Sequence, residues 1–157
     1  MLPPLSGRPI RVEMRSTLGP NSAATSIPRR LILLDAEVLA HRGEFERILV
    51  HELFHFAWVR LSNGKRRSWE QVLREEFTSH TPGELGWSAE WRKAKLDRSD
   101  ARRRTPRWRR YACESFCDTA AWLYAGLRDH DEFTLPKNAR LPRRVWFREY
   151  YRRAARI

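Results

Sequence analysis

Residues 44–61 read EFERILVHELFHFAWVRL, the most strongly apolar helical segment of the chain together with residues 107–127. Nine of the twelve residues from 48 to 59 are apolar, and they lie on every side of a helix. A helix that is apolar all round belongs inside a protein. The three exceptions are His51, Glu52 and His55, which form an HExxH pattern. Burying three polar groups is costly unless each one is satisfied, so we predict that they serve a metal ion.

The spacing of the two histidines explains how one helix holds a metal. Residues four apart project from the same face, so His51 and His55 can bind one ion together. Glu52 follows His51 directly and can reach a water on the open side of the metal. Two imidazoles with a carboxylate suit zinc. A catalytic zinc generally has three protein ligands and keeps one position for water, so the chain must supply a third.

The second strongly apolar helix, expected over residues 107–127, offers that third ligand. Glu114 is the best candidate because its carboxylate is otherwise an expensive charge in an apolar setting. Asp118, one turn later, can accept the free ring N–H of a ligating histidine. Two rivals stay open as ligands. His80 stands at an expected helix end, and Cys117 suits a structural zinc instead.

These motifs resemble the gluzincin clan of zinc metallopeptidases. In that clan HExxH lies on one helix, and a second helix carries a glutamate, often followed four residues later by an aspartate. By position, His51, His55 and Glu114 match the zinc ligands, Glu52 matches the general base, and Asp118 matches the partner of a ligating histidine. The resemblance covers about a third of the chain and implies a zincin-like hydrolase that acts on a peptide or protein substrate.

Two smaller families show similar spacing with departures. In the ImmA/IrrE-type peptidases the second helix has alanine and asparagine where this chain has Cys117 and Asp118. In SprT-like peptidases a downstream histidine is wanted where this chain has Trp87. The spacing and the small size of the chain resemble the minimal gluzincins and, loosely, the ImmA/IrrE-type peptidases, whereas Trp87 counts against ligation of the SprT-like kind.

The order of the expected elements predicts an α+β fold in one zincin-like domain over residues 1–157, with a small N-terminal β-sheet before a mainly helical bundle that carries the metal site. Ile10, Val12 and Met14 alternate with charged residues, which is typical of a strand. The resemblance implies an edge strand beside the cleft, for which we choose residues 29–35. The remaining expectations are a loop over 18–28, helices over 68–79, 87–96 and from 145 onward, and a basic loop at about 97–106.

The mechanism follows from zinc chemistry. The metal lowers the pKa of its water toward about 7 and polarises the scissile carbonyl. Glu52 then takes the water proton and passes it to the leaving nitrogen. The oxyanion needs a further donor, and Tyr111, one turn before Glu114, is the candidate.

The charge of the chain favours acidic partners. The net charge is +12, and 31 of the 157 residues are Lys or Arg. A basic nucleic-acid-binding or interaction protein with a structural or vestigial zinc site is therefore the alternative function. No apolar run is long enough to cross a membrane, no signal peptide is expected, and the two cysteines form no disulfide framework, so we expect a cytoplasmic protein. The arginines expected to contact nucleic acid are Arg102, Arg103, Arg104, Arg107, Arg109 and Arg110.

Overall fold

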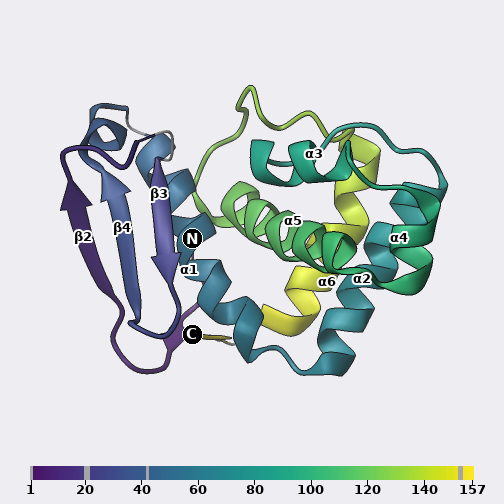
Figure 1. The fold of residues 1–157 in the computed structure, drawn as a ribbon, viewed down its shortest axis with the longest axis horizontal. Coiled ribbons are helices and arrows are strands. Elements are labelled where there is room, and N and C mark those ends of the chain that lie inside the picture. Colours follow the sequence, from purple (N-terminus) through teal and green to yellow (C-terminus); the bar gives the residue numbers. More distant parts are fainter. Residues whose placement is uncertain (1, 20–21, 42, 152–153) are drawn as a thin grey trace.

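The computed structural model of the chain describes residues 2–19, 22–41, 43–151 and 154–157. A small sheet comes first and a mainly helical region follows, so the fold is α+β, as the order of the elements predicts (Figure 1). Within the described ranges, no helix is both long enough and apolar enough to cross a membrane.

The main sheet has the order β2-β4-β3, with β2 at Arg11–Arg15, β4 at Leu31–Asp35 and β3 at Ala23–Ser26. β4 runs parallel to β2 and antiparallel to β3. The choice of residues 29–35 as the edge strand was therefore wrong. The run LILLD is buried on both faces, which is typical of a central strand.

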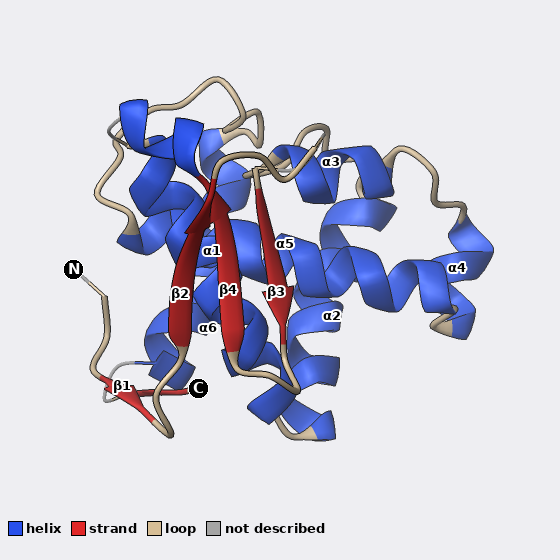
Figure 2. Cartoon of the chain, turned by 60° about the vertical axis from the view of Figure 1, so that its left-hand side comes forward, coloured by secondary structure: helices blue, strands red, loops and turns tan. Residues whose placement is uncertain are grey.

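The strand that borders the helices is β3, within a stretch that was expected to be a loop (Figure 2). Its sequence AATS has small side chains and no apolar alternation, so the pattern gave no strand signal. Pairing with β4 holds it extended. Two residues of the expected loop, Pro20 and Asn21, lie outside the described residues.

Helix α1 (Glu44–Arg60) lies between the sheet and the other helices (Figure 1). On one side Phe56 packs with Ile32 of β4. On the other side Phe54 packs against Phe116 of α5 (Pro106–Tyr124), with ring centroids 5.9 Å apart. The all-round apolar character of α1 thus reflects burial between two layers, which is what its pattern predicts.

Helix α2 (Asn63–Thr78) begins earlier than expected. Its cap is Ser62, whose hydroxyl accepts a hydrogen bond from the Lys65 amide. The helix therefore begins at Asn63 and not at the expected residue 68. The guanidinium of Arg66 donates to the carbonyls at the end of α1, and this allows the next helix to start at once.

The basic segment expected as a loop at 97–106 contains helix α4 (Arg98–Arg103). Asp97 caps it by accepting hydrogen bonds from the amides of Ser99 and Asp100. Arg104 ends it with a left-handed backbone (φ 51°) and pairs with Glu70 at 2.6 and 2.7 Å. Local capping therefore produces a helix where apolar periodicity is absent.

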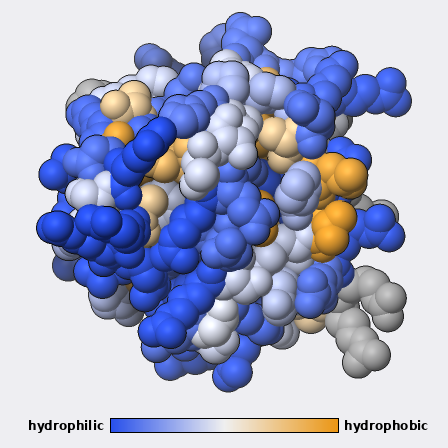
Figure 3. Space-filling view, turned by 90° about the vertical axis from the view of Figure 1, so that its right-hand side faces the viewer, coloured by the Kyte–Doolittle hydropathy of each residue, from blue (hydrophilic) through white to orange (hydrophobic). Residues whose placement is uncertain are grey.

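Helices α3 (Trp87–Lys93) and α6 (Arg140–Tyr151) complete the helical region. α6 starts at Arg140, before the expected residue 145. A short β1–β5 pair (Leu5–Ser6 with Ala155–Arg156) joins the two ends of the chain. The face in Figure 3 is mostly hydrophilic, with apolar side chains exposed at a few separate places.

A buried ionic cluster joins α2, α6 and the segment before α3. Arg143 of α6 donates to Glu76 of α2 at 2.9 Å through Nε. It also donates to Glu84, which precedes α3, at 2.7 Å through Nη1. A buried charge is tolerated only when it is paired and hydrogen-bonded, and each of these three groups is. The cluster therefore fixes the elements that surround α5.

Candidate metal centre

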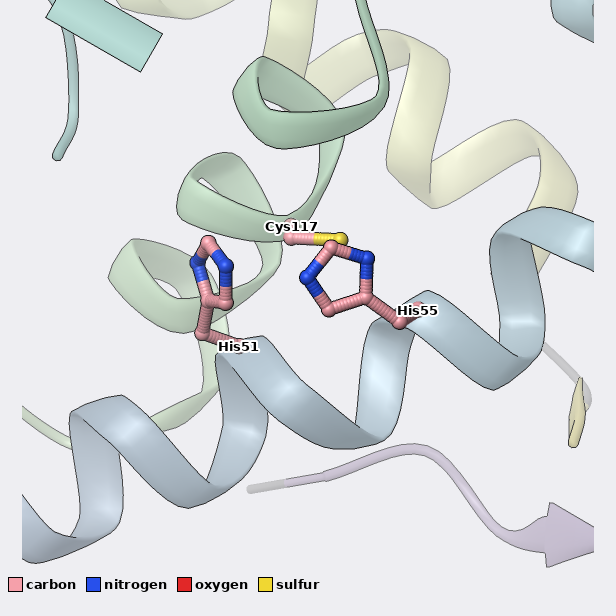
Figure 4. Close-up of side chains that lie close together, drawn as sticks. All are labelled: His51, His55 and Cys117. Carbon is pink, nitrogen blue, oxygen red and sulfur yellow. The ribbon is translucent and has the colours of Figure 1, made fainter. Parts of the chain in front are cut away.

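The two histidines of HExxH project from α1 toward α5 (Figure 4). Their ring centroids lie 5.0 Å apart, as expected for side chains one turn apart on a helix face. His51 is buried and His55 is half-buried. Glu114, Cys117 and Asp118 all come from α5, so two crossing helices supply the site.

His51 lies between two carboxylates of α5. Its Nδ1 donates to Asp118 Oδ1 at 2.7 Å, and its Nε2 is 3.3 Å from Glu114 Oε2. Burial opposes the charged ring, but these carboxylates more than offset it and hold the pKa of His51 well above its usual range. Nε2 is therefore the ring nitrogen of His51 that faces Glu114. A metal ion would bind Nε2 in place of a proton.

Asp118 is itself fixed from its other side. Its Oδ2 accepts a hydrogen bond from the Ala89 amide of α3 at 3.0 Å, and its side chain is 2% exposed. Gly86 lies so close that a Cβ there would be under 3.0 Å from the carboxyl group. Asp118 therefore holds His51 in one tautomer and one orientation, with Nε2 directed at Glu114.

His55 contacts Glu114 and Cys113. Its Nε2 is 4.0 Å from Glu114 Oε2, and its Nδ1 is 3.6 Å from the sulfur of Cys113. A hydrogen bond from Cys117 lowers the pKa of Cys113 to about 6. Cys113 therefore contacts Nδ1 of His55 as Asp118 contacts Nδ1 of His51. This contact was not predicted from the sequence.

Glu114 is the carboxylate that approaches both histidines. Burial would raise its pKa, but the hydrogen bond from His51 and the charges of His55 and Arg92 hold that pKa below its ordinary value. The guanidinium of Arg92 lies 3.4 Å from Glu114 Oε1. This leaves Oε2 on the side of the histidines, in position to bind a metal.

Two distances show how nearly these side chains are placed to bind one zinc ion. Ligand atoms about 2.0–2.2 Å from a tetrahedral zinc lie about 3.3–3.6 Å from one another. The separation from Glu114 Oε2 to His51 Nε2, 3.3 Å, lies in that range, whereas the separation to His55 Nε2, 4.0 Å, is longer. The donor set of two imidazoles and one carboxylate therefore fits zinc in type, and the His55 ring would have to move closer to Glu114 to bind the same ion.

Cys117 forms a second possible set with the same histidines. Ligand atoms of His51, His55 and Cys117 all lie within 4.8 Å of one another (Figure 4). Cys117 is fully buried, and burial raises the pKa of its thiol well above the usual range. Glu114 lies nearer the surface, with 15% of its side chain exposed. The two sets differ in chemistry, since thiolate ligands predominate in structural zinc sites, whereas two histidines with a glutamate are a catalytic set.

Glu52 lies at the open side of the site and contacts the sheet. Its Oε2 accepts a hydrogen bond from the hydroxyl of Thr25 on β3 at 2.5 Å. Glu52 lines two cavities. One, of about 220 Å³, is lined by Ala23, His51 and Trp87 among others, and the second, of about 150 Å³, by Thr25, His55 and Trp58 among others. Both cavities border β3, and Glu52 lies between them.

Two sequence expectations lie away from the centre. Tyr111 is fully buried, and its hydroxyl donates to Glu84 at 2.5 Å, so it cannot serve as the oxyanion donor. The expectation failed because Glu84, far off in sequence, captures the hydroxyl in the buried ionic cluster. His80 is exposed beside Arg98, with 3.2 Å between His80 Nε2 and Arg98 Nη2, and is not grouped with His51 and His55.

The basic residues divide into two groups. Arg104 is engaged by Glu70, and the indole of Trp108 is fully buried, so Trp108 cannot stack on a base. The exposed arginines among those expected to contact nucleic acid are Arg102, Arg103, Arg107, Arg109 and Arg110.

Three residues around the site escaped the sequence analysis: Thr25, Arg92 and Cys113. Thr25 and Arg92 stand in segments without a motif, and only the tertiary fold brings them to the centre. Cys113 did carry a signal, because it precedes Glu114 and lies one turn from Cys117.

No known family model matches the chain, and comparisons with curated proteins and with solved structures find no significant match either.

Proposed function

We propose that this chain is a zinc-dependent metallopeptidase whose zinc is held by His51, His55 and Glu114. The observation that carries the proposal is the approach of one Glu114 oxygen to the Nε2 atoms of both histidines, at 3.3 and 4.0 Å, beside a cavity that Glu52 lines. When bound, zinc supplies Lewis acidity, which polarises a scissile carbonyl and makes water easier to deprotonate.

The residues of the chain then have distinct roles. Asp118 accepts the Nδ1 proton of His51 and orients the ring. Glu52 lines this cavity, where it can take a proton from the attacking water and deliver it to the leaving nitrogen. In the part of the chain that the structure describes, the second oxygen of Glu52, Oε1, receives no hydrogen bond and is free for this task.

The free edge of β3 supports a peptide as the substrate. The Asp35 amide donates to the Ser22 carbonyl, so Ala24 forms the next hydrogen-bonded pair with β4. The main-chain groups of Ala23 and Thr25 therefore face away from β4, because hydrogen-bonded and non-hydrogen-bonded pairs alternate in antiparallel sheets. An extended peptide can pair with these groups as an added strand.

Replacement of the general base tests the function. We expect Glu52→Gln to fold, to bind zinc as the wild type does, and to cleave a mixed peptide library about 10²–10⁴-fold more slowly. The matched control is Glu75→Gln on the exposed face of α2, which should cleave at the wild-type rate. If zinc-loaded wild type and Glu52→Gln are equally inactive, the peptidase proposal is wrong. If Glu52→Gln loses zinc, the ligand assignment is wrong.

The alternative function, a basic nucleic-acid-binding or interaction protein with a structural or vestigial zinc, has two supports. One is the set of exposed arginines on α4 and α5. The other is the nearness of Cys117 to both histidines. An inert zinc gives no role to Glu52, whereas hydrolysis does, so the peptidase remains our conclusion.

A further inference from the structure

The hydrogen bond between β3 and Glu52 is not explained by the zinc site itself. Thr25 Oγ1 donates to Glu52 Oε2 at 2.5 Å, and it lies 3.4 Å from the Glu52 main-chain carbonyl. The two residues belong to different layers of the fold, β3 and α1. Both line the 150 Å³ cavity beside His55.

We propose that Thr25 is a positioning residue that holds Glu52 in place for proton transfer, so that one residue aligns both the substrate and the base. The inference rests on the proposed peptidase function. The main-chain groups of Thr25 face the free edge of β3, where a peptide can pair, while its hydroxyl binds the carboxylate of Glu52.

The chemistry of the two side chains gives a physical reason for this role. Glu52 is half-buried between two cavities, and a glutamate side chain has several accessible rotamers. Thr is β-branched, so its χ1 angle is restricted and its hydroxyl is a stiff anchor on a strand. One hydrogen bond to Oε2 selects one Glu52 rotamer and leaves Oε1 directed away from Thr25.

The consequence is a separation between binding and chemistry. Without the hydroxyl, zinc and peptide should bind as before, because Thr25 is not a proposed zinc ligand and would pair with a peptide through its main-chain groups. Glu52 should populate other rotamers, and a displacement of about 1 Å at a reacting group can cost 10²-fold in rate. We therefore expect Thr25→Val to lower kcat about 10–100-fold with KM within about twofold of the wild type.

Three variants test this role. Thr25→Val keeps the shape but removes the donor, Thr25→Ser restores the donor, and Thr78→Val makes the same chemical change at an exposed position at the end of α2. For each variant, kcat and KM are measured on one cleaved peptide, and zinc affinity is measured by competition with a chelator. We expect Thr25→Ser to have at least a third of the wild-type kcat and Thr78→Val to have the full wild-type kcat.

A second measurement needs no activity. In urea unfolding of the metal-free chain, Thr25→Val, Glu52→Ala and the double variant form a double-mutant cycle. Hydrogen bonds to charged groups are among the stronger ones, so we expect a coupling of about tenfold or more in the unfolding equilibrium constant.

The outcomes distinguish this inference from the proposed function. A wild type that cleaves peptides while Thr25→Val keeps its kcat overturns the positioning role alone, as does a coupling factor near one. Equal loss of kcat in Thr25→Val and Thr25→Ser also overturns it, because the hydroxyl then does not matter. A zinc-loaded wild type that cleaves no peptide overturns the peptidase function, and the role of Thr25 in it, whatever the coupling.

Discussion

Gly86→Ala is a sharp test of how the site is held, because Gly86 itself contacts no candidate zinc ligand. A Cβ at residue 86 would lie under 3.0 Å from the carboxyl group of Asp118, whose side chain is 2% exposed and cannot retreat into solvent. The backbone of Gly86 has φ 177°, an extended conformation that any residue adopts, so the effect is one of space alone.

The magnitude follows from the contacts that the added methyl disturbs. Asp118 would have to shift, and its bonds to His51 Nδ1 at 2.7 Å and to the Ala89 amide at 3.0 Å would lengthen. Loss of such an orienting partner typically costs 10–100-fold in metal affinity. Overpacking a well-filled region costs about 1–3 kcal/mol of the free energy of unfolding.

The assay is zinc affinity by competition with a chromophoric chelator, together with urea unfolding. Gly64→Ala is the matched control, because the nearest atom to its new Cβ is Ser62 Oγ at 3.9 Å, and alanine in a helix should stabilise the chain by up to about 1 kcal/mol. Asp118→Ala should lower zinc affinity by a similar 10–100-fold, and adding Gly86→Ala to it should change little. A Gly86→Ala variant with wild-type zinc affinity would refute the role given to Asp118.

Two other predictions concern the rest of the molecule. Burial would raise the pKa of Glu84, but Arg143 and Lys93 hold that pKa below its ordinary value of 4.5. Ionised Glu84 therefore stabilises the fold above pH 4.5, and this contribution is lost as the pH falls through the lowered pKa. Glu84→Gln should therefore cost about 3–5 kcal/mol at pH 7 and show a shallower acid decline in urea unfolding between pH 7 and 3, whereas an unchanged acid decline would contradict this. Labelled duplex DNA should bind weakly, with a slope of log K against log salt no steeper than about −4.5 for the five exposed arginines, and a flat salt response would leave the charge without a role in binding DNA.

The sequence predicted those parts of the fold whose signal is local. The apolar pattern of α1 placed it inside the molecule, and the helical spacing of Glu114 and Asp118 put both on the side of α5 that faces His51. The α+β order also followed from the pattern. These features depend on periodicity along one element, which a single sequence displays directly.

The sequence could not predict features that depend on pairing between distant segments. β3 has no apolar alternation and is a strand only because β4 pairs with it, so the edge of the sheet was assigned to the wrong strand. Tyr111 was expected at the zinc because it lies one turn before Glu114, but its hydroxyl donates to Glu84, which is 27 residues away in sequence. The contact between Thr25 and Glu52 likewise joins a strand and a helix that no local pattern connects.

The central claim is that α1 and α5 together hold one zinc through His51, His55 and Glu114. X-ray absorption at the zinc edge, on chain purified without chelators, tests it most directly. We predict one zinc per chain with only nitrogen and oxygen neighbours, at about 2.0–2.2 Å. A sulfur neighbour at about 2.3 Å would instead assign the third position to a cysteine, with Cys117 the nearest to both histidines, and would contradict the catalytic ligand set.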